Sequence, residues 1–414
     1  MTSICLYFEI HQPFRIKPFH FFDIGNIDGP YDYFDQDRNR SILNKVSAKS
    51  YRPATDLLLD LVHRHSGDFR FTLSVSGLAL EQFQMWDPYI VDNLKRLADT
   101  GHVEFLAETY YHSLSSLYSE REFREQVYMH IRAMQKVIGY TPHSFRNTEL
   151  IYSNHIAWLA ASMGFQSILM EGADRVLGWR SPNFPYQAKY NPEIKCMLKN
   201  YSLSDDIAFR FGEKNWREWP LTADKFSRWA HEIAGNGTVL NLFMDFETLG
   251  EHQWADTGIF DFLESLPGSL LRHPDFSFST VSEAVKRWPV VGEIDTNDPI
   301  SWADTERDVT AWLGNNMQRQ AAEALYELTE QVYATGDAAL LDVFRKLQTS
   351  DHFYYMCTKW FSDGDVHKYF SPYNSPHDAY VYYMNVLHDL RQRAEHIQLV
   401  RDENEAQSIQ KKLA

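Results

Sequence analysis

The stretch GTVLNLFMDFETLGEHQW, residues 237–254, joins a buried apolar segment to a cluster of polar and aromatic side chains. Its apolar run at residues 237–242 predicts a buried strand. If that strand continues to Glu247, side-chain alternation places four residues on one face, namely Asn241, Phe243, Asp245 and Glu247. Two carboxylates on one face repel each other, which raises the pKa of one and keeps it protonated as a proton donor near neutral pH. In the alternative interpretation, Asp245 caps the next helix and Glu247 is a solvated loop residue.

The chain around this stretch alternates short apolar segments with segments of helical spacing. The predicted strands lie at residues 4–10, 69–75, 103–107, 144–148, 166–170, 195–203, 238–244 and 276–279. One predicted helix, residues 280–287, begins with a Thr280/Glu283 capping box, whereas residues 14–49 are predicted to be an elaborated loop. Alternating strands and helices imply βα units and a parallel sheet, and about seven such units predict a closed or nearly closed barrel.

Polar side chains recur directly after the predicted strands. In chain order they are His11, Glu108, His112, Glu149, Asp245 and Glu247. Barrels built from βα units place their active sites at this end of the strands. The character of the sequence changes near residues 290–300, and from residue 304 onward the pattern predicts helices alone. The sequence therefore predicts an α/β barrel domain at residues 1–295 and a C-terminal helical domain at residues 296–414.

Composition excludes several classes of partner. The 414-residue chain has a formal net charge of −16, which argues against nucleic acid and against an anionic membrane surface, because both bind through excess Lys and Arg. Cys5, Cys196 and Cys357 form no metal-binding pattern, so we expect reduced, structural cysteines. The N-terminus lacks the features of a signal peptide, and no apolar run is long enough to span a membrane. We therefore expect a cytoplasmic protein.

Five sequence blocks, in chain order, resemble the motifs of glycoside hydrolase family 57. They are HQP at residues 11–13, GHVE at 101–104, FRNTE at 145–149, MDFETLGEH at 244–252 and SWADTERDVTAWLGN at 301–315. A further block, QTSDHFYY at residues 348–355, resembles the α-amylase-like members of that family. A single block such as HQP carries little information, whereas five in order form a specific pattern that extends from residue 4 to about residue 360.

The resemblance implies a distorted (β/α)7-type parallel barrel followed by a helical domain that completes the cleft. It also implies hydrolysis or transfer of α-1,4-glucans with retention of anomeric configuration and without a cofactor. By motif, Glu149 matches the nucleophile of the family and Asp245 matches its general acid/base. We expect the chain to lack the extra C-terminal β-domain of the larger glucanotransferases and the long insertions of the branching enzymes, which favours the α-amylase-like group.

The chemistry of a retaining glycosidase agrees with this pair of acids. It needs two carboxyl groups roughly 5–5.5 Å apart, one ionised to attack the anomeric carbon and one protonated to donate to the leaving oxygen. The ends of two different strands can provide that separation. Asp245 near an ionised Glu149 should have a raised pKa, which should fall once Glu149 is glycosylated.

Further candidates bind the sugar or tune the acids. They are His11, His112, Glu247, His252, Trp254, Trp302, Asp351 and His352. Several have a structural alternative: His11 would be a strand-end histidine satisfied by the backbone, His112 would simply be a cap, and Trp254 would belong to the core. Asp351, which with His352 would reach the cleft from the helical domain, could instead cap a helix together with Ser350.

Three other functions stay open. A glucanotransferase uses the same carboxylates and the same covalent intermediate, with a sugar hydroxyl as the acceptor. A metal-dependent carbohydrate hydrolase needs clustered His and Asp ligands, and because the histidines of HQP and GEH are isolated in sequence, we expect no metal. A catalytically silent glucan-binding protein is disfavoured by the presence of both acids. The expected partner is an α-glucan or malto-oligosaccharide, and an oligomer is compatible with the sequence but not indicated by it.

Overall fold

The computed structural model describes residues 1–26, 29–359 and 371–413. The chain forms two compact units. The first contains Met1–Gln12, Arg40–His112 and Glu120–Val309, and the second contains Pro13–Asn39, Ser113–Ser119 and Thr310–Ala414. Two segments that precede the predicted boundary at residues 295–296, Pro13–Asn39 and Ser113–Ser119, therefore belong to the second unit, which the sequence pattern does not reveal.

The first unit is built on two five-stranded sheets. The first sheet has the order β3 (Val103–Phe105), β2 (Phe71–Val75), β1 (Thr2–Ile10) and β8 (Val239–Asp245), and β9 (Phe276–Phe278) also pairs with β1. The second has the order β10 (Glu293–Ile294), β6 (Tyr186–Ala188), β7 (Asn191–Lys199), β5 (Ser167–Glu171) and β4 (Phe145–Arg146). All pairings are parallel except that of β6 with β7. The predicted parallel α/β fold is confirmed.

The two sheets meet at two junctions. A parallel bridge between Ala107 and Phe145 joins the end of β3 to β4. At the other junction the Asn200 amide donates to the Asn241 carbonyl (2.9 Å), and the Asn241 side chain donates to the Leu198 carbonyl (2.8 Å), which joins β7 to β8. Buried side chains of both sheets also share one cluster, which includes Cys5, Tyr7, Leu169, Met197 and Phe243. Closure into a barrel stays a prediction, and both junctions favour it.

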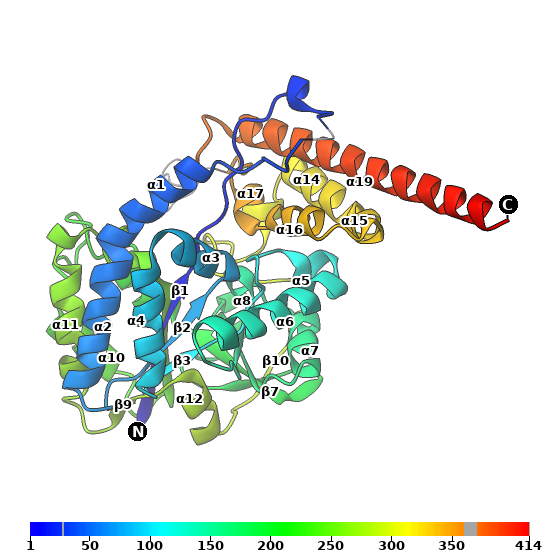
Figure 1. The fold of residues 1–414 in the computed structure, drawn as a ribbon. Coiled ribbons are helices and arrows are strands. Elements are labelled where there is room, and N and C mark those ends of the chain that lie inside the picture. Colours follow the sequence, from blue (N-terminus) through cyan, green and yellow to red (C-terminus); the bar gives the residue numbers. More distant parts are fainter. Residues whose placement is uncertain (27–28, 360–370, 414) are drawn as a thin grey trace. The chain divides into compact units, whose positions relative to one another are not determined.

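Amphipathic helices cover the outside of the first sheet. They include α2 (Arg52–Arg64), α3 (Gly77–Trp86), α4 (Pro88–Asp99), α10 (Ala223–His231) and α11 (Ile259–Leu270). Figure 1 shows α2, α4, α10 and α11 side by side along this sheet. Helix α12 (Val281–Arg287) begins with the predicted capping box, in which Thr280 and Glu283 each bind the other's backbone amide. Such caps satisfy backbone donors that the first turn of a helix leaves unpaired.

Helices α6 (Glu120–Val137), α7 (Asn154–Ser162), α8 (Asp174–Leu177) and α9 (Tyr201–Ala208) also belong to the first unit. Helix α1 (Gln36–Val46) and a π-helical turn (Ser47–Tyr51) occupy part of the predicted loop at residues 14–49, so that prediction is wrong for these residues. Charged and amide side chains along α1 leave it without a strong apolar stripe, which hid its helical period in the sequence.

The second unit is helical, as predicted. Helices α13 (Thr310–Leu313), α14 (Asn316–Glu327), α15 (Thr329–Thr335), α16 (Ala338–Lys346) and α17 (Ser350–Tyr354) precede the long α19 (Pro376–Leu413). Helices α14, α15 and α16 pack along α19 (Figure 1). The N-terminal segment joins the same helix, since Asp389 accepts hydrogen bonds from the Gly25 amide (2.7 Å) and the Tyr33 hydroxyl (2.5 Å). Within the described residues, no helix has both the length and the apolar character that crossing a membrane requires.

Candidate active site

Glu149 lies in a short turn that follows β4 and is bound through both carboxylate oxygens. Its backbone has a φ of 56° and that of Leu150 a φ of 50°, a left-handed conformation that side chains with a β-carbon rarely adopt. Oε1 lies 3.0 Å from Nε2 of His112, and Oε2 accepts a 2.8 Å hydrogen bond from Nε1 of Trp302. The side chain is still 22% exposed, so a substrate can reach it. Backbone strain of this kind persists where the surrounding structure holds it, commonly at functional sites.

Asp245 is the last residue of β8, and its Cα is paired in register with that of Glu9 on β1. Burial raises the pKa of its carboxyl group; the nearby His252 opposes this rise, and the negative charge of Glu149 adds to it. The structure therefore brings the two predicted catalytic acids into one site.

Although Asp245 directly precedes a 3-10 turn, its side chain makes no capping hydrogen bond to that turn. The capping alternative for Asp245 is therefore wrong.

Glu247 reaches the site by a different route from the one expected. Strand β8 ends at Asp245 and Glu247 lies in the following 3-10 turn, so strand alternation does not place it. Its side chain is buried and accepts a hydrogen bond from the Tyr51 hydroxyl, which in turn accepts one from the Gln12 amide (2.9 Å). Burial, followed by the charge of Asp245, raises the pKa of Glu247 to about 8. The interpretation of Glu247 as a solvated loop residue is wrong.

His112 connects Glu149 to two further acids. Its Nδ1 atom lies 3.3 Å from Oε2 of Glu108 and 3.3 Å from Oε1 of Glu9. The His11 ring stacks on the His112 ring with a centroid distance of 4.0 Å. Burial, and then the charge of His11, lowers the pKa of His112 to about 3, so the imidazole is neutral at pH 7.

His11 is oriented from its other side. Its Nδ1 atom lies 2.7 Å from Oγ of Ser76, which also caps helix α3 by accepting from the Ala79 amide (3.2 Å). A residue of the HQP block is thereby tied to the start of a helix that follows β2. The His11 ring is partly exposed, in contrast to that of His112.

A buried cation, Arg146, lies beside the two acids that contact His112. Arg146 on β4 is fully buried, forms an ion pair with Glu9, and lies 4.0 Å from Oε2 of Glu108. Its guanidinium group also lies 5.3 Å from the ring centroid of Trp302. Glu9 and Arg146 were not among the site residues predicted from the sequence. The available signal was a charged residue within an otherwise apolar strand, where an unpaired charge is costly.

The same acids resemble a metal-ligand set in spacing alone. Oxygen and nitrogen donors of Glu9, Glu108 and His112 lie within 4.8 Å of one another. However, the guanidinium group of Arg146 is paired with Glu9 and supplies the positive charge at this place. A metal ion bound to this donor set would be repelled by that guanidinium group.

The Trp302 side chain contacts three charged groups. Its indole N–H donates to Glu149, and its ring lies between Arg146 and Lys199, whose Nζ atom is 5.4 Å from the ring centroid. Lys199 is buried and forms an ion pair with Asp205 (2.8 Å). The predicted stacking of Trp302 on a sugar stays a prediction.

His252 and Trp254 line a shallow hollow of about 330 Å³ together with Phe209. Trp254 is 52% exposed, so the alternative that placed it in the core is wrong. Nζ of Lys49 lies 4.7 Å from its ring centroid. Burial lowers the pKa of His252, and the neighbouring Asp245 opposes that shift. One residue of the hollow, His252, therefore interacts electrostatically with a candidate catalytic acid.

Asp351 and His352 belong to the second unit. Both lie in α17, where His352 is buried, with Nε2 3.2 Å from the Lys346 carbonyl and its ring 5.6 Å from that of Tyr383. Helix α17 begins at Ser350, so Ser350 is not the residue that caps it. The predicted role of both residues in the cleft stays a prediction.

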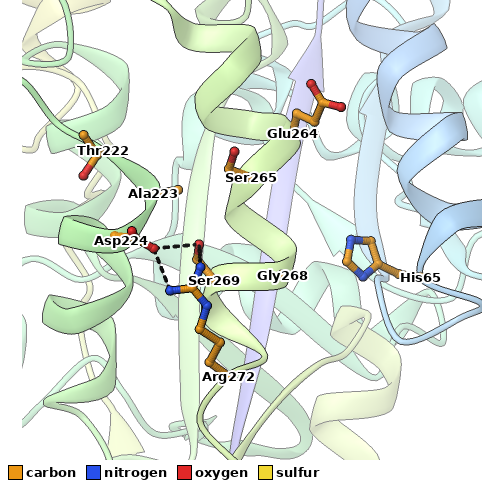
Figure 2. A pocket seen from close by; sticks show the side chains of 9 residues that line it. All are labelled: His65, Thr222, Ala223, Asp224, Glu264, Ser265, Gly268, Ser269 and Arg272. Atoms are coloured by element: carbon orange, nitrogen blue, oxygen red, sulfur yellow. Dashed lines mark hydrogen bonds and ion pairs between the residues drawn. The ribbon is translucent and has the colours of Figure 1, made fainter.

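A larger hollow, of about 520 Å³, lies on the outside of the first unit between α10, α11 and the end of α2 (Figure 2). Figure 2 shows Asp224 bound to Arg272 (2.8 Å) and to Ser269 (3.3 Å) in this hollow. Among its described lining residues there is no Trp, Tyr or Phe and none of the predicted site residues. We do not assign it to the active site.

A family model for glycosyl hydrolase family 57 matches residues 5–297, which is more than half of the chain. The chain belongs to glycosyl hydrolase family 57. It is therefore a glycoside hydrolase by family, as the motifs predicted. A relative from Methanocaldococcus jannaschii, described as a "putative alpha-amylase", is 42% identical over 393 residues, which cover 92% of this chain and 82% of the relative.

Solved structures with low sequence identity share the fold. The 4-alpha-glucanotransferase of Thermococcus litoralis matches 85% of this chain with a TM-score of 0.64 at 13% identity, and the chain spans 56% of that protein. The GH57-type branching enzyme of Pyrococcus horikoshii matches 86% of this chain and 85% of its own, with a TM-score of 0.64 at 14% identity. An alpha-amylase of Thermotoga maritima matches 96% of both chains, with a TM-score of 0.60 at 14% identity. These matches support the α/β architecture with its helical C-terminal region.

Proposed function

We propose that this chain hydrolyses α-1,4-glucans with retention of configuration, with Glu149 as the nucleophile and Asp245 as the general acid/base. The observation that carries the proposal is the contrast between the two environments. Two side chains, His112 and Trp302, contact the oxygens of Glu149, and N–H donors there favour an ionised carboxylate. Asp245 has a raised pKa because it is buried and faces the charge of Glu149. One acid is prepared to attack and the other to donate a proton.

The reaction proceeds by two displacements. An oxygen of Glu149 attacks the anomeric carbon while Asp245 gives its proton to the departing glycosidic oxygen. Esterification removes the negative charge of Glu149, which is one of the causes that raise the pKa of Asp245. Asp245 then acts as a base and takes a proton from water, whose oxygen attacks the anomeric carbon and releases Glu149.

The α-glucan class of substrate is supported by the names of the relatives, which include amylase, glucanotransferase and branching enzymes. Several side chains around Asp245 suit a polyhydroxyl ligand. Glu247 and His252 offer hydrogen-bonding groups, and the exposed rings of Trp254 and Phe209 offer flat apolar faces. We assign these residues to binding of the substrate.

Transfer to a sugar acceptor is the second candidate. The exposed rings of Phe209 and Trp254 line the same hollow as His252, whose pKa responds to the charge of Asp245, and we assign this hollow to an acceptor sugar. A sugar held there would compete with water for the covalent intermediate. Hydrolysis and transfer differ in acceptor, not in the catalytic pair.

Incubation with maltoheptaose tests both candidates. We expect the wild-type protein to yield shorter sugars, and Glu149→Gln and Asp245→Asn to lose at least about 10³-fold in rate, because each removes an essential group. Glu251→Gln is the matched control, since Glu251 is a buried acid of the same segment that pairs with Lys45 (2.6 Å). Longer as well as shorter products would identify the transferase. Full activity of Glu149→Gln would refute the assignment of the nucleophile.

A further inference from the structure

The tautomer of the neutral His112 imidazole is linked to the charge on Glu149. A neutral imidazole carries one N–H group, so one ring nitrogen donates and the other accepts. Nε2 faces Glu149 at 3.0 Å, and Nδ1 faces Glu9 and Glu108 at 3.3 Å each. His112 is 1% exposed and is not in contact with bulk solvent that could supply a substitute partner. Both contacts must therefore be satisfied within the cluster.

Two arrangements are available. If Nδ1 carries the proton, it donates to an ionised acid, and the lone pair of Nε2 faces Glu149, which must then be protonated to avoid repulsion. A protonated Glu149 does not attack a sugar. If Nε2 carries the proton, it donates to an ionised Glu149, and the lone pair of Nδ1 faces Glu9 and Glu108. One of those acids must then hold a proton and donate it.

The charges around the cluster favour the second arrangement. The titratable or charged groups that face it are Tyr7, Glu9, His11, Glu108, Arg146, Glu149 and Asp245. With all acids ionised, one guanidinium group would balance several buried carboxylates, which is costly where water is excluded. One proton shared by Glu9 and Glu108 reduces this excess of negative charge.

A buried oxygen of Glu9 without a hydrogen-bond partner also favours a proton on the pair Glu9 and Glu108. Within the described part of the chain, Oε1 of Glu9 is buried and has no hydrogen-bond partner as an ionised acceptor, although it lies 3.3 Å from Nδ1 of His112. Its other oxygen is paired with Arg146. The contact to Nδ1 that has hydrogen-bond geometry is that of Oε2 of Glu108, so a proton on that oxygen would be donated to Nδ1, and sharing this proton with Glu9 lessens the cost of leaving Oε1 of Glu9 as a buried, unpaired charge. Consistent with this, burial raises the pKa of Glu9; Arg146 opposes the rise, and the charges of Glu108, Glu149 and Asp245 add to it.

We propose that Glu9 and Glu108 share one proton that is donated to Nδ1 of His112, and that this fixes the Nε2–H tautomer that holds Glu149 as a carboxylate. Glu9, Glu108 and His112 are thus positioning residues that do not touch the sugar's reacting atoms. The inference rests on the proposed role of Glu149. It extends that role by stating why the nucleophile is ionised in a site that contains more buried acids than cations.

The direct test is the tautomer of His112 in the full-length protein at pH 7. Nitrogen NMR of histidine-labelled protein distinguishes Nε2–H from Nδ1–H imidazole, and His112→Gln identifies the signal by its loss. We expect the Nε2–H tautomer with a hydrogen-bonded Nδ1. An Nδ1–H or a doubly protonated ring would overturn the proposal. This readout requires no turnover, so it is independent of whether maltoheptaose is a substrate.

Two variants of Glu108 add a kinetic readout. Glu108→Gln keeps an N–H group that can donate to Nδ1 without titrating, so we expect kcat within about threefold of wild type and the same tautomer. Glu108→Leu removes the carboxyl oxygen that has hydrogen-bond geometry to Nδ1 and leaves Glu9, which is paired with Arg146 and less well placed to donate. We expect kcat to fall about 10- to 100-fold with little change in KM, because a hydrogen bond to a charged system is lost. A wrong imidazole tautomer costs a serine-protease triad about 10⁴-fold in kcat, which sets the upper limit. Equal losses in both variants would contradict the proton-sharing arrangement.

Discussion

The substitution Arg146→Met removes a buried cation that lies beside two buried acids, Glu9 and Glu108. The guanidinium group is fully buried, is paired with Glu9, and lies 4.0 Å from Oε2 of Glu108. Methionine keeps much of the length and apolar packing of the side chain, so the change is mainly one of charge. The first unit should therefore lose stability for an electrostatic reason.

The expected loss follows from the burial of the pair. Breaking a buried ion pair by removing one partner costs about 3–5 kcal/mol, and because Glu108 is also left without this cation, we expect about 4–5 kcal/mol at pH 8. Arg146 normally lowers the pKa of Glu9, which burial raises. Without Arg146, the folded protein takes up a proton on Glu9 more readily. The loss should consequently shrink to about 3 kcal/mol at pH 5.

Urea unfolding of wild type and variant at both pH values measures these losses. Arg64→Met is the matched control, because Arg64 pairs with Asp60 where the two side chains are 43% and 56% exposed, and we expect at most about 1 kcal/mol. The double variant Arg146→Met/Glu9→Gln should recover about 2 kcal/mol, since it removes the unpaired charge. A loss below about 1 kcal/mol for Arg146→Met, or an equal loss at pH 5 and pH 8, would refute the reasoning.

Three other changes test separate parts of the site. Trp302→Phe removes the donor to Oε2 of Glu149, and we expect kcat/KM to fall about tenfold, whereas Trp288→Phe, which removes a 2.9 Å indole hydrogen bond to a serine hydroxyl, should leave kcat/KM unchanged. Equal effects would show that the bond to Glu149 has no special weight. Glu247 has a folded-state pKa of about 8, above its ordinary value, so it adds stability at low pH that is lost as the pH rises towards 8. Between pH 5 and pH 8, the free energy of unfolding of Glu247→Gln, measured with urea, should fall less than that of the wild type, by on the order of 4 kcal/mol. An equal fall in the two proteins would contradict this account. Ser76→Ala removes the cap of α3 and should lower the free energy of unfolding by about 1 kcal/mol, with no loss expected if the cap is unimportant.

The sequence predicted the parallel α/β fold because the strand and helix periods are visible in it. It also predicted that polar residues after strands gather, since parallel strands end at the same edge of a sheet. Glu149, Asp245, His11 and His112 lie in one site for that reason. The helical C-terminal region was equally visible, because no strand pattern occurs there.

Residues that depend on long-range packing were not predicted. Glu9 and Arg146 sit within strands, and their pairing arises from how two sheets meet rather than from any local pattern. Tyr51 contacts Glu247 from a π-helical turn, which has no clear sequence signature. Strand alternation was extended two residues too far, to Glu247, because the chain turns directly after Asp245.

Trapping of the covalent intermediate tests the central claim most directly. A fluorinated α-glucosyl fluoride that forms the glycosyl-enzyme but hydrolyses slowly should label the wild-type protein once, and peptide mass spectrometry should place the label on Glu149. Asp245→Asn should accumulate the same adduct, because the base that assists water is missing. A label on Glu247, Glu9 or another acid, or release of product with inverted configuration and no adduct, would contradict the account.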